Sequence, residues 1–458
     1  MRALAALVLT GLIAGCVPTS DVQRLDSGPG ATEPVRVYRP GVPQPFAAAR
    51  SNGQMVQDFL ELGFAMESGR PIESFSRFDG PVRVVTRGTP PGQALFDLER
   101  LLGRLRSEAQ IDIARVAQAP EGANTITVEF LPRATMQAVV PAAACFVVPN
   151  VSSWGGFVAN RRSPSIDWTR VVTRTSAAVF IPDDTTPQEI RDCLHEEIGQ
   201  ALGPLNDLFR LTDSVFNDDN FQTTLTGFDM LLLRVWNSAE LTPGLTRDQV
   251  AARLPALFNR LNPHGRRPLE GMPGLTPRNW VQSVEQALAS SGGHQHRREG
   301  ANRALGIARA NGWQDTRLAL SLMLAARLAP REQGEDALQG LLRAGDIYRA
   351  TPGGEVHAAH IDMQLAVQAL ANAQVDTVLA LTARASPVAA RTENAALLAS
   401  LGFLRAEALA MAGRADEARA VRLDSFAAAR YGFGSDSAAH TRMDEIARIA
   451  ASTQLARR

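Results

Sequence analysis

The residues with the clearest chemical potential lie in one segment, between Cys193 and Asp207. His195 and Glu196 suggest a zinc site, because two histidines four residues apart on one helix face, with a glutamate between them, can bind zinc and activate water. The residue four places after His195 is Gly199, which has no ligand atom. A zinc site that begins at His195 is therefore excluded, and we expect His195 to be a hydrogen-bonded neighbour of a cleft rather than a ligand.

A reading frame shifted by one residue places different side chains in the metal-binding positions. Metzincin metallopeptidases carry the motif H-E-x-x-H-x-x-G-x-x-H, in which three histidines bind zinc and the glutamate is the general base. The corresponding residues are Glu196, Gln200 and Asn206 in the ligand positions, Glu197 in the general-base position and Gly203 at the turn. The segment therefore resembles a metzincin active-site helix.

A second segment adds to this resemblance. Ser214, Phe216 and Asp218 belong to a run that is similar to the Met-turn of metzincins, with Phe216 where that family has methionine. The likeness extends over residues 77–263 and includes the order of elements before the helix. It implies a zincin-like mixed sheet with the helix packed against it.

The departures from the motif argue against catalysis. None of the three ligand positions carries an imidazole, and the carboxamides of Gln200 and Asn206 are weak neutral donors that suit zinc poorly. We therefore expect no metal and no cofactor. Without a metal, Glu197 has no polarised water to deprotonate near neutral pH. The resemblance thus implies a metzincin-like domain that has lost its activity.

Three other interpretations of these side chains stay open. The first is an active hydrolase that uses Glu197 as the general base with an unusual metal held by Glu196, Asp207 or Asp218. In the second, the polar runs at 206–207 and 217–220 converge on the cleft and form an oxygen-rich pocket for Ca²⁺ or Mg²⁺. The third is a solvated helix face that carries no site.

The N-terminus has the features of a bacterial export signal. Met1 and Arg2 are followed by an apolar stretch, residues 3–12, that is too short to span a bilayer. The run from Leu12 to Cys16 resembles the lipobox of bacterial lipoproteins, which implies lipidation of Cys16 after removal of residues 1–15. An ordinary secretory signal with an incidental cysteine is the alternative. We expect a lipid-anchored protein of the bacterial cell envelope that faces the periplasm from the outer membrane.

Two cysteines remain once Cys16 carries lipid. Cys145 and Cys193 would pair most simply as a disulfide in an oxidising compartment, and two separate buried thiols are the alternative. The whole chain resembles a family of Gram-negative lipoproteins whose central domain is of unknown function. The run that carries this resemblance comprises Cys193, His195, Glu196, Glu197, Gln200, Leu202, Gly203, Asn206 and Asp207.

Hydrophobic periodicity predicts a mixed α/β domain over residues 49–270, preceded by a flexible tether at 16–48. Strands are expected at 82–85, 111–113, 125–130, 145–148 and 176–181. Helices are expected at 53–67, 92–105, 187–202 and 227–238. The helix at 187–202 has the clearest boundaries, because Thr186, Pro187 and Glu189 have the spacing of a capping box and Gly203 precedes a proline.

The C-terminal part is rich in alanine, leucine and arginine at helical spacing. Residues 299–458 are therefore expected to form helical hairpins, joined to the first domain by a linker at 271–298. The segment 408–418 resembles the inter-helix turn of tetratricopeptide repeats. His357 and His360 are expected on an ordinary helix surface. The predicted fold class is α+β: a zincin-like mixed-sheet domain followed by an all-α domain.

Charge limits the classes of partner. The chain has 47 basic and 47 acidic residues, a formal net charge of zero, and no basic stripe, which argues against nucleic acid. The expected partners are the membrane, through the N-terminal lipid, and a polypeptide or cell-wall component held by the helical surfaces and the former cleft. We expect a binding or scaffolding role, with a purely structural spacer as the remaining alternative.

Overall fold

The computed structural model describes Tyr38 and residues 50–268, 274–289 and 292–457. They fall into two compact units, each described by itself: one lies within Gln44–Leu275, and the other comprises Thr276–Arg458 with Tyr38. The predicted signal peptide, Cys16 and nearly all of the predicted tether lie outside the described residues. No described helix is both long and apolar enough to cross a bilayer.

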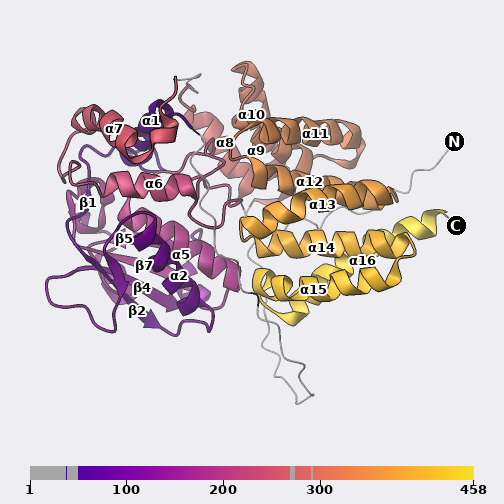
Figure 1. The fold of residues 1–458 in the computed structure, drawn as a ribbon, viewed down its shortest axis with the longest axis horizontal. Helices are drawn as coiled ribbons and strands as arrows, with labels where there is room; N and C mark the ends of the chain where they lie inside the picture. The colour runs from indigo at the N-terminus through magenta and orange to yellow at the C-terminus, as the bar shows by residue number, and fades with distance from the viewer. Residues whose placement is uncertain (1–37, 39–49, 269–273, 290–291, 458) are drawn as a thin grey trace, which may run out of the picture. The chain divides into compact units, whose positions relative to one another are not determined.

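A five-stranded mixed sheet is the centre of the first unit, with strand order β3-β2-β4-β7-β5 (Figure 1). Strands β2, β3, β4 and β7 are parallel, and β5 is antiparallel at the edge beside β7. The strands of this sheet are β2 (Val82–Gly88), β3 (Ile113–Arg115), β4 (Asn124–Leu131), β5 (Phe146–Pro149) and β7 (Ser176–Pro182). A separate parallel pair joins β1 (Arg77–Phe78) to β6 (Thr173–Arg174).

Two helices, α2 (Ala94–Ser107) and α5 (Pro187–Leu202), pack against one face of the sheet. Because side chains alternate along a strand, Ile126 and Val128 of β4 face this main core. The other face is covered in part by α3 (Arg133–Gln137) and α4 (Trp154–Asn160), where Phe180 packs in a smaller aromatic cluster. The α+β class is therefore confirmed.

Several helices and strands have other bounds than expected, and two of them show the physical reason. The helix expected at 53–67 is α1 (Asn52–Gly63), because the chain turns back after it and Ala65 forms an antiparallel bridge with Pro71. The strand expected from Ile111 begins only at Ile113, because the Ile111 amide donates to the Leu105 carbonyl instead of a strand. The helix prediction was wrong at its C-terminal end, and the strand prediction was wrong at both ends, because β3 runs from Ile113 to Arg115. In both segments, tertiary pairing rather than periodicity decides the boundary.

Three helices complete the first unit around an aromatic cluster. They are α1, α6 (Gly227–Trp236) and α7 (Arg247–Leu261). The ring of Phe59 in α1 lies 4.7 Å from that of Trp236 in α6 and 6.4 Å from that of Phe258 in α7, measured between ring centroids. This cluster joins the ends of α1 and α6 to the core beneath α5.

The second unit consists of helices that pack as consecutive hairpins (Figure 1). They are α8 (Arg278–Leu288), α9 (Gly293–Ala310), α10 (Thr316–Arg327), α11 (Gly334–Ala350), α12 (Glu355–Ala371), α13 (Val375–Arg391), α14 (Ala395–Met411), α15 (Ala415–Phe433) and α16 (Asp436–Arg457). The expected all-α region of helical hairpins is confirmed. The segment 271–298, expected to be a linker, contains α8, because its apolar side chains, including Trp280, are buried against neighbouring helices.

The helical hairpins have a regular period. Left-handed backbone recurs at every twentieth residue, at Gly353, Ala373, Glu393 and Gly413, each in the turn between two helices. Helices α12 and α14 therefore begin 40 residues apart, at Glu355 and Ala395. Tetratricopeptide repeats have a period of about 34 residues, so these hairpins are longer than that repeat.

His357 and His360 are not on a helix surface, as expected, but buried. His357 is fully buried and its ring lies 4.8 Å from that of Tyr348, and His360 is 9% exposed. The expectation failed because α12 is covered by neighbours on most of its circumference, which its sequence alone does not reveal.

Candidate functional site

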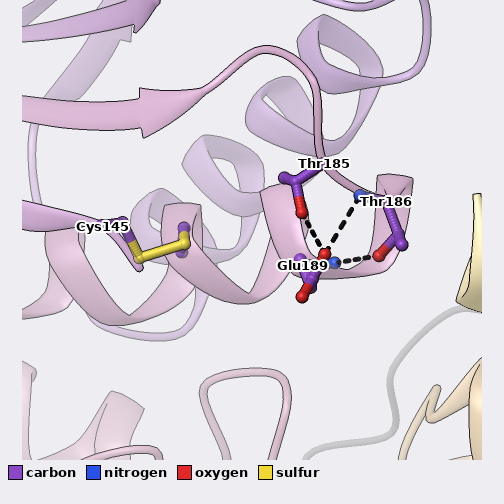
Figure 2. Close-up of a disulfide and its surroundings, with 5 residues drawn as sticks. Cys145, Thr185, Thr186 and Glu189 are labelled. Atoms are coloured by element: carbon purple, nitrogen blue, oxygen red, sulfur yellow. Dashed lines mark hydrogen bonds between the residues drawn. A yellow bond between two sulfur atoms is a disulfide. The ribbon is translucent and has the colours of Figure 1, made fainter. Parts of the chain in front are cut away.

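Helix α5 carries most of the predicted site, and its first turn is fixed locally. Thr186 accepts a hydrogen bond from the Glu189 amide at 3.1 Å, and the Glu189 carboxylate accepts one from the Thr186 amide at 3.1 Å, as the sequence predicts (Figure 2). The Thr185 hydroxyl also donates to Glu189. This capping box sets the start of α5 and therefore the rotation of its later residues.

A disulfide attaches the middle of α5 to the edge of the sheet. Cys193 in α5 is bonded to Cys145, the residue before β5 (Figure 2). The predicted pairing is confirmed. The Cys145 sulfur and carboxylate oxygens of Glu196 and Glu197 lie within 4.8 Å of one another. Because this sulfur is in a disulfide, it offers no thiolate to a metal.

The second ligand position is occupied by an amide that already has partners. The Gln200 amide nitrogen donates to Glu67 Oε1 and to Asp207 Oδ2, each at 3.3 Å. Gln200 therefore acts as a hydrogen-bond donor to two carboxylates. An imidazole that binds zinc would present a lone pair at this position instead.

The third ligand position, Asn206, is turned away from α5. Its amide nitrogen donates to the backbone carbonyl of Glu61 at 3.0 Å. The next residue, Asp207, contacts Gln200 in its place. The structure thus brings Glu196, Gln200 and Asp207 together, and leaves Asn206 outside this group.

Burial and like charges raise the pKa values of the carboxyl groups around α5. Burial first, and then Asp218, Glu67 and Asp192, raises the pKa of Glu196 to about 8. Burial, followed by Glu196 and Glu67, raises the pKa of Glu197 well above its usual value. Burial, followed by Glu67, Glu196 and Asp218, does the same to the pKa of Asp207. The charged neighbours that raise these three pKa values are all carboxylates. Such strongly shifted pKa values are typical of functional sites.

Two oxygen atoms of these carboxyl side chains have no hydrogen-bond partner among the described residues. Glu197, at the general-base position, is 5% exposed, and its Oε2 atom accepts no hydrogen bond from any described residue. Asp207 Oδ1 is also buried without a partner in the part of the chain that the structure describes. Orphaned buried carboxylate oxygens are costly unless a proton or a cation satisfies them.

His195 points away from the carboxyl groups of Glu196, Glu197 and Asp207. Its Nδ1 atom accepts a hydrogen bond from the Leu225 amide at 3.0 Å, so the neutral ring carries its proton on Nε2. Burial lowers the pKa of His195 well below its usual value, and Arg104, Arg191 and Arg100 lower it further. His195 therefore secures the loop before α6.

The segment that resembles a Met-turn packs directly under α5. The Ser214 hydroxyl donates to Asp229 at 2.5 Å, and the Val215 amide donates to the same carboxylate at 3.1 Å. The fully buried Phe216 ring lies against Gly199, where an added Cβ would be 2.9 Å from the ring. Phe216 thus packs directly beneath α5.

The polar run after Phe216 is mostly satisfied by its own backbone. The Asn217 amide donates to the Leu211 carbonyl at 2.6 Å, and Asp219 accepts from the Phe221 amide at 3.1 Å. Within this run, only Asp218 affects the carboxyl side chains around α5, because it raises the pKa values of Glu196 and Asp207. The two polar runs therefore contribute Asp207 and Asp218 rather than their asparagines.

Two residues of this region had no signal in the sequence. Glu67 lies in the turn after α1, where its amide donates to the Leu205 carbonyl at 3.3 Å. Arg174 is buried below the end of α5 and donates to the carbonyls of Gln200, Ala201 and Gly203. Both come from segments far from α5 in the chain, and neither belongs to a motif.

The edge strand β5 is closed to a further strand. The Asn150 amide donates to the Ser176 carbonyl, so alternate residues from Asn150 face β7, and Val147 and Pro149 face outward. The Val147 carbonyl already accepts the Trp168 indole N–H at 3.2 Å, and proline has no amide hydrogen. An extended peptide therefore finds little to pair with at this edge.

A separate cavity of about 680 Å³ lies over the sheet. Its polar lining includes Arg87, Gln118, Thr127, Asn150 and Ser176. Thr127 alternates with the core-facing Ile126 and Val128, so the cavity opens on the face away from α5. None of the predicted site residues lines it.

A three-ligand zinc site does not fit these residues. The Gln200 amide donates a hydrogen bond at a position where zinc needs a ligand with a lone pair. The Asn206 side chain is turned away, and the Cys145 sulfur is in a disulfide. What remains is a group of carboxyl oxygens, which suits hard cations better than zinc.

Comparisons with known proteins place the first unit in one family. No curated protein and no solved structure matches the chain. Residues 52–256 match the family model described as "Protein of unknown function (DUF2927)". The match begins with α1 and ends inside α7, so it includes the sheet, α5 and all the acidic residues around α5 described above. The chain therefore contains a DUF2927 domain, which spans residues 52–256.

Proposed function

We propose that this protein is an exported, lipid-anchored protein of the bacterial cell envelope. In this proposal, the DUF2927 domain has a metzincin-like core without peptidase activity. Its role is to bind a polypeptide or cell-wall partner. The observation that carries the proposal is the hydrogen bonding of Gln200. Its amide donates to Glu67 and Asp207 where a working metzincin needs an imidazole ligand.

The arrangement around α5 supports a metzincin-like scaffold. The order of strands and helices up to α5 agrees with the resemblance, α5 ends at Gly203, and Phe216 lies beneath the helix against Gly199. In a metzincin, these positions would belong to the active-site helix, its turn and the Met-turn.

The surroundings of Glu197 support the loss of catalysis. Its pKa is raised well above its usual value by burial and by Glu196 and Glu67. A general base would also need a polarised water, and the amide of Gln200 at the second ligand position offers no lone pair to a metal that would polarise one.

The surfaces available to a partner differ between the two units. Strand addition at β5 is disfavoured, since Trp168 and Pro149 close that edge. The helical hairpins of the second unit are an architecture that presents extended surfaces to polypeptides. We therefore assign partner binding to the helical unit and to surfaces of the DUF2927 domain other than the β5 edge.

One experiment tests the scaffold by restoring its ligands. The variant E196H/Q200H/D207H in the full-length protein changes the three positions that the structure brings together, and it is expected to bind one zinc ion per molecule, while the wild type binds none in these positions. The matched control is D112H/T135H/R247H, which places three histidines on separate segments of the same unit. A folded E196H/Q200H/D207H protein that takes up no more zinc than the control would refute the metzincin-like arrangement.

A second experiment tests the absence of catalysis. The full-length protein, incubated with casein and with a peptide library, is expected to release no fragments above those released by E197Q. Glu197→Gln is nearly isosteric and removes the carboxylate that a general base requires, and contaminating peptidases affect both samples equally. Cleavage by the wild type that E197Q abolishes would instead establish a hydrolase, the candidate favoured by the unpartnered Oε2 atom of Glu197.

Localisation is tested through the lipidation site. Cys16→Ala is expected to abolish incorporation of labelled palmitate and to release the protein from the membrane fraction of expressing cells. Persistence of both the label and membrane attachment in C16A would refute the anchor.

A further inference from the structure

Five carboxyl groups from three segments of the DUF2927 domain meet beside the C-terminal half of α5. Glu196 and Glu197 lie in α5, Glu67 in the turn after α1, and Asp207 and Asp218 in the long connection between α5 and α6. We call these five side chains the carboxylate cluster. The Glu67 amide, bonded to the Leu205 carbonyl at 3.3 Å, holds the first segment against the loop that carries Asp207.

Contacts within the carboxylate cluster are short. The Gln200 amide nitrogen lies 3.3 Å from Glu67 Oε1 and 3.3 Å from Asp207 Oδ2, so these two carboxyl groups share one donor. The side chains of Glu67 and Asp207 also hydrogen-bond to each other. Two carboxyl groups can approach in this way only if a proton or a cation stands between their charges.

The charged groups that act on Glu196, Glu197 and Asp207 are acidic. The nearby arginines are engaged elsewhere: Arg210 pairs with Asp58 and Glu61, and Arg174 donates to backbone carbonyls. Like charges therefore surround these three carboxyl groups.

An orphaned atom gives independent evidence for a ligand. Glu197 Oε2 is buried and has no hydrogen-bond partner among the described residues, although the carboxylates of Glu197 and Glu196 have oxygens within 4.8 Å of each other. Asp207 Oδ1 is orphaned in the same way. Native proteins seldom leave such atoms unsatisfied, and a bound cation would satisfy both.

From this geometry we infer that Glu67, Glu196, Glu197 and Asp207, with Asp218 at the rim, form a binding site for one hard divalent cation, Ca²⁺ or Mg²⁺. All the donor atoms are oxygens, to which the Gln200 carbonyl can add another. His195 presents no free lone pair, because its Nδ1 accepts the Leu225 amide, and Cys145 is in a disulfide. The donor set therefore selects against zinc.

The site is accessible from solvent. Glu67 and Asp218 are exposed, Glu196 and Asp207 are half-buried, and Glu197 is buried. A hydrated cation could thus meet the exposed carboxylates first and lose water as it reaches the inner ones. The site does not depend on the proposed function, since a cation held here could stabilise a binding domain or a hydrolase alike.

The test is calorimetric titration of the chelator-treated, full-length protein with Ca²⁺, Mg²⁺ and Zn²⁺ in separate arms. We expect saturable binding of one Ca²⁺ or Mg²⁺ per molecule and a rise of the melting temperature with that ion. Glu196→Gln and Asp207→Asn should each weaken binding at least about tenfold. The control Asp112→Asn makes the same change on an exposed carboxylate paired with Arg83, and should bind as the wild type does.

A second readout separates a cation site from a structural role. Without cation, E196Q and D207N should melt at a temperature no lower than that of the wild type, because each replaces a carboxyl group crowded by other carboxyl groups with a neutral amide of the same shape. A carboxylate needed only for packing would lower the melting temperature on substitution. If either variant fails to fold, Glu67→Gln, on an exposed residue, keeps the binding test available.

Three results would overturn the inference. They are the absence of saturable Ca²⁺ and Mg²⁺ binding at millimolar concentration, undiminished binding by an E196Q/D207N protein, and tight binding of Zn²⁺ alone. These three binding results are obtained without the peptidase assay and without the three-histidine variant. Failure of the cation site is therefore distinguishable from failure of the proposed function.

Discussion

Arg174 donates its Nη2 hydrogen to the backbone carbonyl of Gly203, 2.7 Å away, at the C-terminal end of α5. Its Nη1 atom serves the carbonyls of Gln200 and Ala201 at 2.8 and 2.7 Å. The guanidinium is 1% exposed and lies 5.0 Å from the centre of the Trp168 ring. Burial lowers the pKa of Arg174 to about 9, so it stays protonated at neutral pH, where its charge favours the negative end of the helix dipole.

Replacing Arg174 should strongly destabilise the domain. Arg174→Met keeps much of the side-chain volume but removes the donor that the carbonyls of Gln200, Ala201 and Gly203 share, and we expect a loss of about 3–5 kcal/mol in the free energy of unfolding. Urea denaturation measures this loss. Arg115→Ala, which breaks an exposed pair with Glu99, should cost less than about 1 kcal/mol. Similar losses for the two variants would contradict the capping role of Arg174.

Gly199 should be required for the contact between α5 and Phe216. A Cβ at Gly199 would lie 2.9 Å from the Phe216 ring and 3.3 Å from Leu225, so Gly199→Ala is expected to cost about 1–3 kcal/mol. Gly103 in α2 is the matched control, because a Cβ there would meet only Arg106, at 3.8 Å. Gly103→Ala should stabilise the protein by about 0.5–1 kcal/mol. Thermal unfolding gives both values, and a neutral G199A variant would refute the close packing.

The helical unit should lose stability in acid because of His360. Burial, and then His357 and Arg327, lowers the pKa of His360 from 6.5 to about 3. The unfolded chain therefore binds a proton on this residue before the folded chain does. The stability that the neutral ring contributes is complete above pH 6.5 and is lost as the pH falls toward 3, by about 1.4 kcal/mol per unit at most.

Hydrogen exchange in α12 at pH 7 and pH 4.5 measures this effect. His360→Gln should flatten the pH dependence, because glutamine does not titrate. His440→Gln, on an exposed residue of α16, should leave the dependence as it is in the wild type. If wild type and H360Q lose protection equally in acid, another group is responsible.

The turns between helical hairpins offer a test of backbone strain. Ala373 has a φ of 52°, a left-handed conformation that disfavours residues with a Cβ. Ala373→Gly should therefore stabilise the protein by about 0.5–1 kcal/mol, since relief of strain exceeds the entropy cost of glycine. Gly413, with a φ of 79°, occupies the equivalent turn, where a Cβ would touch nothing. Gly413→Ala should cost about 1 kcal/mol in chemical denaturation, and shifts of the same sign in both variants would refute the strain.

The sequence by itself determined the features that depend on neighbouring residues. Thr186 and Glu189 predicted the start of α5, Gly203 predicted its end, and the alternation along β4 predicted a strand with one face in the core. Each of these rests on a contact or a periodicity within a few positions, so the order of residues is sufficient information. The pairing of Cys145 with Cys193 was also predictable, because only two cysteines remained to pair.

Only the tertiary structure decided which side chains meet around α5. The motif pointed to Asn206, but the backbone turns it toward Glu61 and brings Asp207 to Gln200 instead. Glu67 and Arg174 reach the helix from distant segments, and a single charged residue in a loop has no periodicity that would reveal its place. Their positions follow from how the core packs, which is a property of the whole domain rather than of any local run of residues.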